Sequence, residues 1–183
     1  LRKSRRPVIW AGGGVPASGA PRELTQLAEA LGAPVMTSVM GKGAIAADHP
    51  LHLGSQGLLS PVQEYLDSCD VMLAIGTRFT EIDTAAWTLR LPEELIHIDL
   101  DPAEIGRNYP ASHSVVGDAK LVLGQLLEII GESSTAPPGR AQEVAEVRAE
   151  VRRNLVDRSS EGVHLIDEIR SAVPSDAIFA NDV

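Results

Sequence analysis

The sequence contains a single cysteine, Cys69, among 183 residues. One thiol cannot form an internal disulfide, and chains without disulfides are typical of a reducing cytosol. We therefore predict a cytoplasmic protein. Cys69 lies between a predicted helix and a predicted strand, a position in which cysteine ordinarily acts as a small buried hydrophobe rather than as a nucleophile.

Aromatic residues, long apolar runs and clusters of positive charge are also scarce. Only 3% of the residues are aromatic while 44% are hydrophobic, which predicts an aliphatic core. No apolar run approaches the ~18 residues of a membrane span. The formal net charge is −9, and the densest basic stretch is the short N-terminal segment 1–7. Neither a nucleic acid nor a membrane is expected as a partner.

The common catalytic and metal-binding motifs are missing as well. There is no G-x-S-x-G, no G-x-x-x-x-G-K-[ST] and no His-Asp-Ser set. The five histidines show no metal-ligand spacing. The sequence therefore predicts no catalytic residue and no metal ligand in this chain.

Apolar runs of strand length alternate with helical stretches along the first 131 residues. The runs are continuous rather than alternating, which is typical of strands covered on both faces in a parallel sheet. This order predicts right-handed crossovers and a doubly wound, mainly parallel α/β sheet. The predicted strands lie at residues 7–12, 33–39, 70–76, 94–100 and 113–118.

Helices are predicted between these strands from apolar spacing and from end signals. A helix over 21–32 carries an apolar stripe at i, i+3, i+4 and i+7, and Gly32 ends it. A second helix over 118–131 has Asp118 as its N-cap and a glycine at its end.

The rest of the chain differs in character. A Pro/Ser/Gly linker leads into a charged helix at 141–158, whose thin apolar seam is typical of a solvated connector. The last residues predict one helix and one strand, too little to bury a core. We predict three parts: a nucleotide-binding-type domain at 1–131, a linker and connecting helix at 132–160, and the truncated start of a further domain at 161–183.

Ligands in an open parallel sheet bind at the carboxyl ends of the strands. Here those ends carry small, polar or glycine residues, whereas the strand bodies are aliphatic. This convergence predicts a ligand crevice. The residues concerned are Gly12, Gly13, Gly14, Thr37, Ser38, Met40, Gly76, Thr77, Arg78, Phe79, Asp99, Asp101 and Asp118.

The triple glycine after the first predicted strand has two interpretations. Without Cβ atoms it lets backbone N–H groups approach a phosphate, and Gly12, Gly14 and Ala17 follow the G-x-G-x-x-[G/A] spacing. Alternatively, the glycines only form a tight turn. The second predicted strand ends in Thr37 and Ser38 where a nicotinamide dehydrogenase needs an acid, so that class is disfavoured.

The acids after the fourth predicted strand also have two roles open to them. A carboxylate there can accept hydrogen bonds from a sugar hydroxyl. Asp101 followed by Pro102 can equally begin a helix as its cap. We favour Asp101 as the cap and Asp99 as the residue facing the crevice. Arg78 either meets a phosphate or pairs with an acid such as Glu81.

Three motifs in a fixed order carry a family resemblance: "MGKG…DHPL…LG", "GTRF" and "IHID-DP-EIG". Together they resemble the central domain of thiamine-diphosphate-dependent enzymes, with the nearest similarity to the acetolactate synthase (acetohydroxyacid synthase) group. The resemblance covers roughly residues 5–130, and the tail "DAIFANDV" is similar to the first strand of that family's diphosphate-binding domain.

The resemblance implies a six-stranded Rossmann-like domain of the DHS-like NAD/FAD-binding type. It implies that the full-length protein is a transferase or lyase that forms or breaks C–C bonds in 2-oxo acids, the carbanion being stabilised by thiamine diphosphate. Thiamine diphosphate and Mg²⁺ would be bound by missing N- and C-terminal domains of the same chain. The full-length protein would be a homodimer or homotetramer, and the fragment alone would be inactive.

The resemblance also assigns FAD or an ADP-type nucleotide to this domain. The implied contacts are Gly12, Gly13, Gly14, Thr37, Ser38, Met40, Gly54, Gln56, Gly57, Gly76, Thr77, Arg78, Phe79, Asp99, Leu100 and Asp118. On this basis Gly13→Val is expected to abolish nucleotide binding by placing a side chain on the diphosphate path. Two alternatives stay open: a stand-alone NAD/FAD-binding module, and a central domain that binds no nucleotide.

Overall fold

The computed structural model describes residues 1, 3–55, 57–131, 140–174 and 177. Within them one sheet has six strands in the order β3-β2-β1-β4-β5-β6, and every neighbouring pair is parallel. This confirms the doubly wound α/β prediction. The strands are β1 (Pro7–Ala11), β2 (Val35–Thr37), β3 (His52–Gly54), β4 (Val71–Ile75), β5 (Glu94–Asp99) and β6 (His113–Val116).

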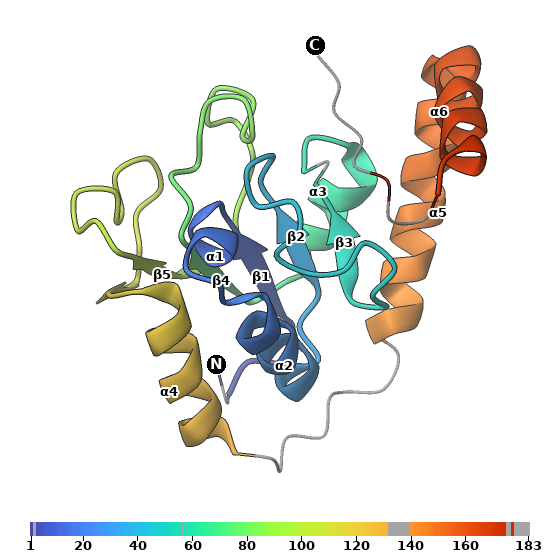
Figure 1. Cartoon of the computed structure of the whole chain (residues 1–183). Helices are drawn as coiled ribbons and strands as arrows, with labels where there is room; N and C mark the ends of the chain where they lie inside the picture. Colours follow the sequence, from blue (N-terminus) through green and yellow to red (C-terminus); the bar gives the residue numbers. More distant parts are fainter. Residues whose placement is uncertain (2, 56, 132–139, 175–176, 178–183) are drawn as a thin grey trace.

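Helices cover both faces of this sheet (Figure 1). They are α1 (Gly14–Ala17), α2 (Pro21–Leu31), α3 (Ser60–Asp67), α4 (Ala119–Ile130), α5 (Arg140–Arg158) and α6 (Ser160–Ala172). Across the described part of the chain, every helix is too short or too polar to serve as a membrane span.

Alternate side chains of each strand enter two separate cores. In β1, Ile9 packs with α2 and α4 on one face, whereas Val8 and Trp10 pack with α3 and α5 on the other. All five residues of β1 and of β4 are buried, as expected for central strands covered on both sides. The continuous apolar runs of β1 and β4 therefore have the predicted cause, whereas β6, predicted in the same way, is exposed along its whole length.

The helix-end signals act as predicted. Gly32 ends α2 with φ of 57°, a left-handed conformation that glycine adopts without a steric penalty. The Asp118 carboxylate accepts hydrogen bonds from the N–H groups of Lys120 and Leu121 and so caps α4. Because an N-cap fixes where a helix begins, Asp118 sets the boundary between β6 and α4.

The charged helix α5 differs from the expected solvated connector. Val144 is fully buried and Val151 nearly so, and both belong to the core formed with α3 and β3. The narrow apolar seam is sufficient to hold α5 on the core, because its valines pack between α3 and β3 and need not cover a broad face. Helix α6 lies along α5 and has no buried residue (Figure 1). The strand predicted after it lies almost entirely outside the described residues.

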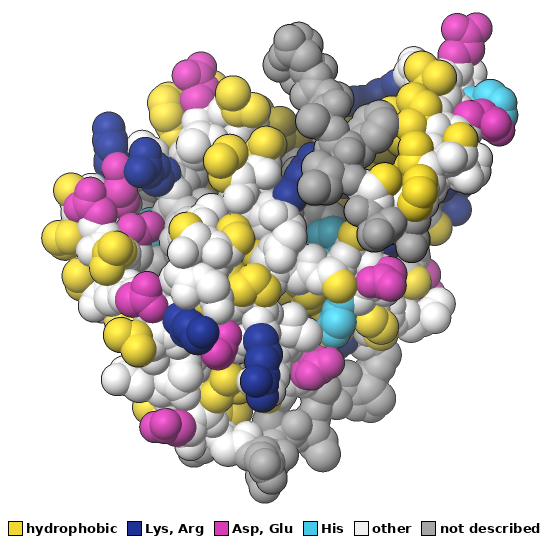
Figure 2. Space-filling model, in the orientation of Figure 1, with side chains coloured by type: hydrophobic (Ala, Val, Ile, Leu, Met, Phe, Trp, Pro, Cys, Tyr) yellow, Lys and Arg dark blue, Asp and Glu magenta, His cyan; other side chains and the backbone are white. Residues whose placement is uncertain are grey.

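Surface charge is mixed in sign on the face that Figure 2 presents. Acidic and basic side chains are interspersed there, and the basic ones do not gather into a continuous patch.

Candidate functional site

A cavity of about 250 Å³ lies where the strand order reverses, at the carboxyl ends of β1, β4, β5 and β6. Such a switch point is where open α/β sheets bind ligands, because crossovers leave it on opposite faces. Six residues selected from the sequence meet there: Gly14, Gly76, Arg78, Asp99, Leu100 and Asp118. Ala17, Ser18, Ile98, Gly117 and Ala119 complete the lining.

The turns after β1 and β4 touch through glycine backbone. A Cβ atom added at Gly12 would lie 2.1 Å from the carbonyl oxygen of Gly76, and one at Gly14 would lie 2.7 Å from the Gly76 Cα. Gly76 itself has φ of 56°, a left-handed conformation. Gly41, in the loop after β2, packs equally tightly on the carbonyl of Ala11. These glycines therefore allow three turns to interlock.

The same contacts occupy donors that a phosphate would need. The N–H of Gly12 donates to the carbonyl of Ile75 at 2.8 Å, and the N–H of Gly14 donates to that of Gly76 at 3.0 Å. A side chain at Gly13 would meet Met40, with its Cβ 3.2 Å from the Met40 Cβ. Gly13 does not line the cavity. The expected loss of nucleotide binding in Gly13→Val stays a prediction, and the structure shows only that the added side chain would meet Met40.

Asp99 is the last residue of β5 and Asp101 lies two residues beyond it, and the two carboxylates have different surroundings. Asp99 lines the cavity, and its Oδ1 accepts the N–H of Asp101 at 2.9 Å. Asp101 lies outside the lining and accepts the N–H of Ala103. The next segment is a series of turns rather than the expected helix, and it ends at Gly106 with φ of 73°.

Arg78 lines the cavity with an exposed side chain. It forms no salt bridge with any other described residue, so the predicted alternative of a pair with Glu81 is not realised. Its guanidinium is the only cationic group beside two carboxylates, Asp99 and Asp118, among the described residues that line the cavity. The site therefore combines two carboxylates, which can accept hydrogen bonds from hydroxyl groups, with one guanidinium, which can bind an anion.

A buried histidine holds two of the loops in place. The Nε2 of His97 lies 2.9 Å from the carbonyl of Thr77, to which it donates, and its Nδ1 accepts the N–H of Gly106. Burial lowers the pKa of His97, although the hydrogen bond to Thr77 opposes this. A neutral imidazole with one donor and one acceptor matches both partners. His97 thus ties the turn after β4 to the turn after β5.

Phe79 and Thr77 are buried beneath the site rather than lining it. Phe79 is 1% exposed and packs edge to face against Trp10, His97 and Tyr109. Its φ of 48° directs the side chain into the core, which the position of Phe79 after a strand does not reveal.

The remaining predicted residues lie elsewhere. Thr37 and Gly54 line a second, larger cavity beside β3. Ser38 is buried and its hydroxyl accepts the N–H of Gly41, whereas Met40 is 76% exposed. A Cβ at Gly57 would meet the side chain of Met36 at 2.8 Å. Gln56 lies outside the described residues.

Two further residues of the crevice lining, Ser18 and Gly117, were not selected from the sequence as ligand contacts, whereas Ala17 is part of the G-x-G-x-x-[G/A] spacing. Ser18 is the C-cap that follows the four-residue helix α1. Gly117 directly precedes the predicted cap Asp118, so the sequence placed it at the end of a strand but did not indicate that it lines the crevice. In the part of the chain described, no group of His, Cys, Asp and Glu side chains is arranged to hold a metal ion.

An all-parallel sheet in this order, with a polar crevice at its switch point, defines a Rossmann-like domain. Residues 1–126 match the family described as "Thiamine pyrophosphate enzyme, central domain". The chain belongs to that family.

Curated relatives carry the names of enzymes. A probable acetolactate synthase large subunit of Methanocaldococcus jannaschii is 49% identical over 130 residues, which is 69% of this chain and 22% of the relative. A probable 2-ketoarginine decarboxylase, AruI, of Pseudomonas aeruginosa is 36% identical over 185 residues, 100% of this chain and 32% of the relative. An acetolactate synthase of Mycobacterium avium is 42% identical over 133 residues, 71% of this chain and 21% of the relative. The chain thus spans between a fifth and a third of the length of these proteins.

Proposed function

We propose that this chain is the central domain of a thiamine-diphosphate-dependent enzyme of the acetolactate synthase type, which forms or breaks C–C bonds in 2-oxo acids. Family membership and the names of the relatives support this proposal. Thiamine diphosphate supplies carbanion stabilisation in such chemistry. Other domains of the same chain would hold it with Mg²⁺, in a cytoplasmic homodimer or homotetramer, and the 183 residues alone would be inactive.

Within that enzyme, the crevice at the switch point would hold the adenosine part of a structural nucleotide, FAD or an ADP-type molecule. Its volume of about 250 Å³ is below the ~300–1,000 Å³ typical of sites for whole drug-sized ligands. A nucleoside fits such a space better than a complete dinucleotide. The single observation that carries this assignment is the meeting of Asp99, Arg78 and Gly14 around one cavity.

Each polar group of the crevice has a use in holding such a ligand. Asp99 uses Oδ1 for the N–H of Asp101, which orients the carboxylate and leaves Oδ2 for a ribose hydroxyl. Arg78 would contact a phosphate, because its planar guanidinium matches phosphate oxygens and no described acid forms a salt bridge with it. Asp118 is already committed to the start of α4, so its contribution is secondary.

The residues that the resemblance assigns to FAD are divided between two cavities, and this favours an ADP-type nucleotide over FAD in the crevice. Thr37 and Gly54, which the family resemblance assigns to FAD, line a different cavity from Asp99. A flavin would need to extend across the turns between the two. We therefore assign only the adenylate part to the crevice.

Calorimetric titration of the purified chain with ADP tests this assignment. We expect Asp99→Asn to weaken ADP binding by roughly tenfold, because an amide replaces one charged acceptor for a hydroxyl. Asp101→Asn is the matched control, since it makes the same change two residues away, outside the cavity, and an amide oxygen can still accept the N–H of Ala103. Equal ADP affinity in the wild type and both variants would reject the crevice as a nucleotide site.

The enzymatic proposal is tested separately in the full-length protein. Turnover of pyruvate should require added thiamine diphosphate and Mg²⁺, and the chain of residues 1–183 should show none. Limited proteolysis tests the proposed domain division: a stable fragment 1–131 would support it, whereas a fragment that retains residues 140–158 would assign α5 to the core domain, as the burial of Val144 and Val151 favours. Turnover that is independent of thiamine diphosphate would reject the enzyme class without affecting the nucleotide assignment.

A further inference from the structure

A second cavity of about 780 Å³ lies between the end of β3, the loop after β2 and the helix α5. It belongs to neither the crevice nor the interlocked glycine turns. Its lining consists of Thr37, Lys42, Gly43, Ile45, Ala46, Ala47, His52, Leu53, Gly54, Ser55, Arg148, Ala149, Val151, Arg152 and Leu155.

The charged residues of this lining are all of one sign, in a chain whose net charge is −9. Lys42, Arg148 and Arg152 converge on the cavity, and no carboxylate lines it among the described residues. Arg152 pairs with Asp167 of α6. Lys42 and Arg148 form no salt bridge within the described residues, so two cations remain for a ligand.

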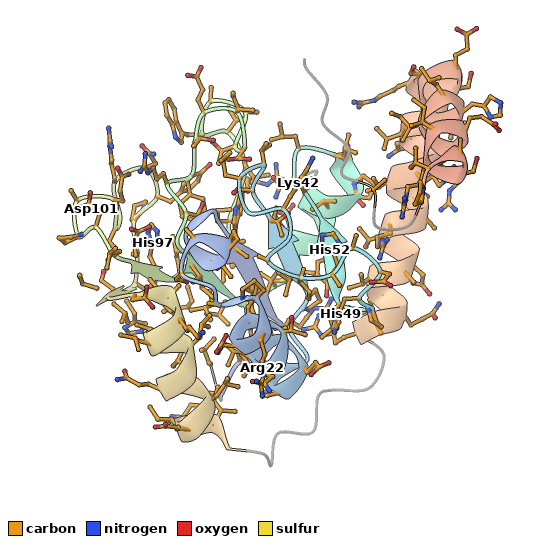
Figure 3. All side chains as sticks on the ribbon, viewed as in Figure 1. Arg22, Lys42, His49, His52, His97 and Asp101 are labelled. Carbon is orange, nitrogen blue, oxygen red and sulfur yellow. The ribbon has the colours of Figure 1, made fainter. Side chains whose placement is uncertain are left out.

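Packing of α5 on the core places two of these cations. Arg148 and Arg152 are four residues apart and therefore lie on one face of α5. Between them Val151 is buried in the core with β3, which fixes the rotation of the helix. Figure 3 shows Lys42 and His52 on the side of the sheet where α5 stands, with Asp101 at the opposite end of the molecule.

Thr37 and His52 add uncharged polar groups to the lining. Thr37 is 2% exposed, and its buried hydroxyl has no hydrogen-bond partner within the described residues. His52 places Nδ1 3.2 Å from the carbonyl of Ala47, which leaves Nε2 for another partner. Burial lowers the pKa of His52, and the charge of Arg148 adds to this effect. A neutral imidazole can accept a hydrogen bond from a hydroxyl group.

We propose that this cavity binds a small phosphate monoester, with its phosphate between Lys42 and Arg148 and its organic part over Thr37 and His52. Lysine and arginine are the usual phosphate ligands, and the absence of a carboxylate from the described lining removes the main competitor for them. The volume exceeds what inorganic phosphate fills, which favours an organic phosphate. This site is independent of the nucleotide crevice, whose charged lining is mostly acidic.

The test titrates the purified chain separately with glycerol phosphate and with inorganic phosphate at fixed ionic strength, using calorimetry. We expect saturable binding, tighter for glycerol phosphate, that weakens by roughly tenfold in Lys42→Ala and in Arg148→Ala. Arg153→Ala is the matched control, because it removes an equal charge from α5 but pairs with Glu150 and lines a different groove. All three side chains are exposed, so we expect the variants to fold, and a melting curve for each checks this.

Several outcomes would overturn the proposal. An equal loss in Arg153→Ala would show a general charge effect, and no loss in Lys42→Ala and Arg148→Ala would place any binding elsewhere. Tighter binding of inorganic phosphate would reject the organic ligand. Asp99→Asn should leave glycerol phosphate binding unchanged, so failure of this site and failure of the crevice can be told apart.

Discussion

The turn after β1 should reject a methyl group at Gly12 and tolerate one at Gly13. In Gly12→Ala the new Cβ would lie 2.1 Å from the carbonyl oxygen of Gly76 and 2.6 Å from the Cα of Thr77. Contacts under 3.0 Å do not occur, so the backbone must move by about 0.9 Å. In Gly13→Ala the new Cβ would lie 3.2 Å from the Cβ and 3.4 Å from the carbonyl oxygen of Met40, contacts that a shift of a few tenths of an ångström in the exposed Met40 loop relieves.

The expected magnitudes differ accordingly. Moving the two turns apart weakens the hydrogen bonds from Gly12 to Ile75 and from Gly14 to Gly76, each contributing about 0.5–1.5 kcal/mol. Strain from the inserted carbon adds about 1–3 kcal/mol. We expect Gly12→Ala to lower the free energy of unfolding by about 3 kcal/mol. Gly13 has helical φ and ψ of −62° and −20°, so Gly13→Ala should change it by less than about 1 kcal/mol.

Urea unfolding followed by circular dichroism measures both values. For a chain of this size, 3 kcal/mol corresponds to a fall of roughly 6–12 °C in melting temperature. An unchanged denaturant slope shows that only stability has changed. Equal stability in the two variants would refute the interlocked-turn argument, because the substitutions differ only in which backbone or side chain their Cβ meets.

Two further predictions concern α5 and its surroundings. Val144→Ala should lower the free energy of unfolding by about 2 kcal/mol because Val144 is fully buried. Val156 lies on the same helix and is 39% exposed, so Val156→Ala should lower it by much less. Equal losses of stability in urea unfolding would contradict the packing of α5 on the core. Burial raises the pKa of Tyr65 to about 12 despite the opposing charge of Arg140, so its contribution to stability is complete below the unfolded pKa of ~10 and is lost as the pH rises through about 12. In a spectrophotometric titration, Tyr65→Phe should remove the later of the two phenolate transitions, and loss of the earlier one instead would contradict the assignment.

The strands were predictable from sequence because central parallel strands must be apolar on both faces. β3 escaped prediction because it has only three residues and comes after a long irregular loop beyond β2. Its place at the edge of the sheet requires little apolar sequence. The other edge strand, β6, was predicted although its residues are exposed, so it is mainly the short length of β3 that hides it in the sequence.

The crevice was predictable only as far as the topology dictates it. Asp99 and Gly14 meet because parallel strands end at one edge of the sheet, and this can be inferred from the order of the elements. Phe79 turns into the core because of a left-handed φ, and Met40 turns outward into solvent. Side-chain direction after a strand depends on backbone angles that composition does not encode.

The helix α5 shows the limit of interpreting amphipathic patterns. Its seam suggested exposure because few apolar residues repeat along it, but two of them fill a gap between α3 and β3. How much apolar surface a helix needs depends on the shape of the surface it packs against, and that is known only once the tertiary structure is known.

The interlocked glycines also bear on how this family is searched for nucleotide binders. Positions 12, 14, 41 and 76 need glycine to let backbone meet backbone, with or without a nucleotide nearby. A homologue that has lost its ligand is therefore expected to keep a G-x-G signature intact, and genome surveys based on that signature will overcount. If the crevice holds a nucleotide as proposed, a carboxylate at position 99 together with an arginine at position 78 is the more discriminating marker.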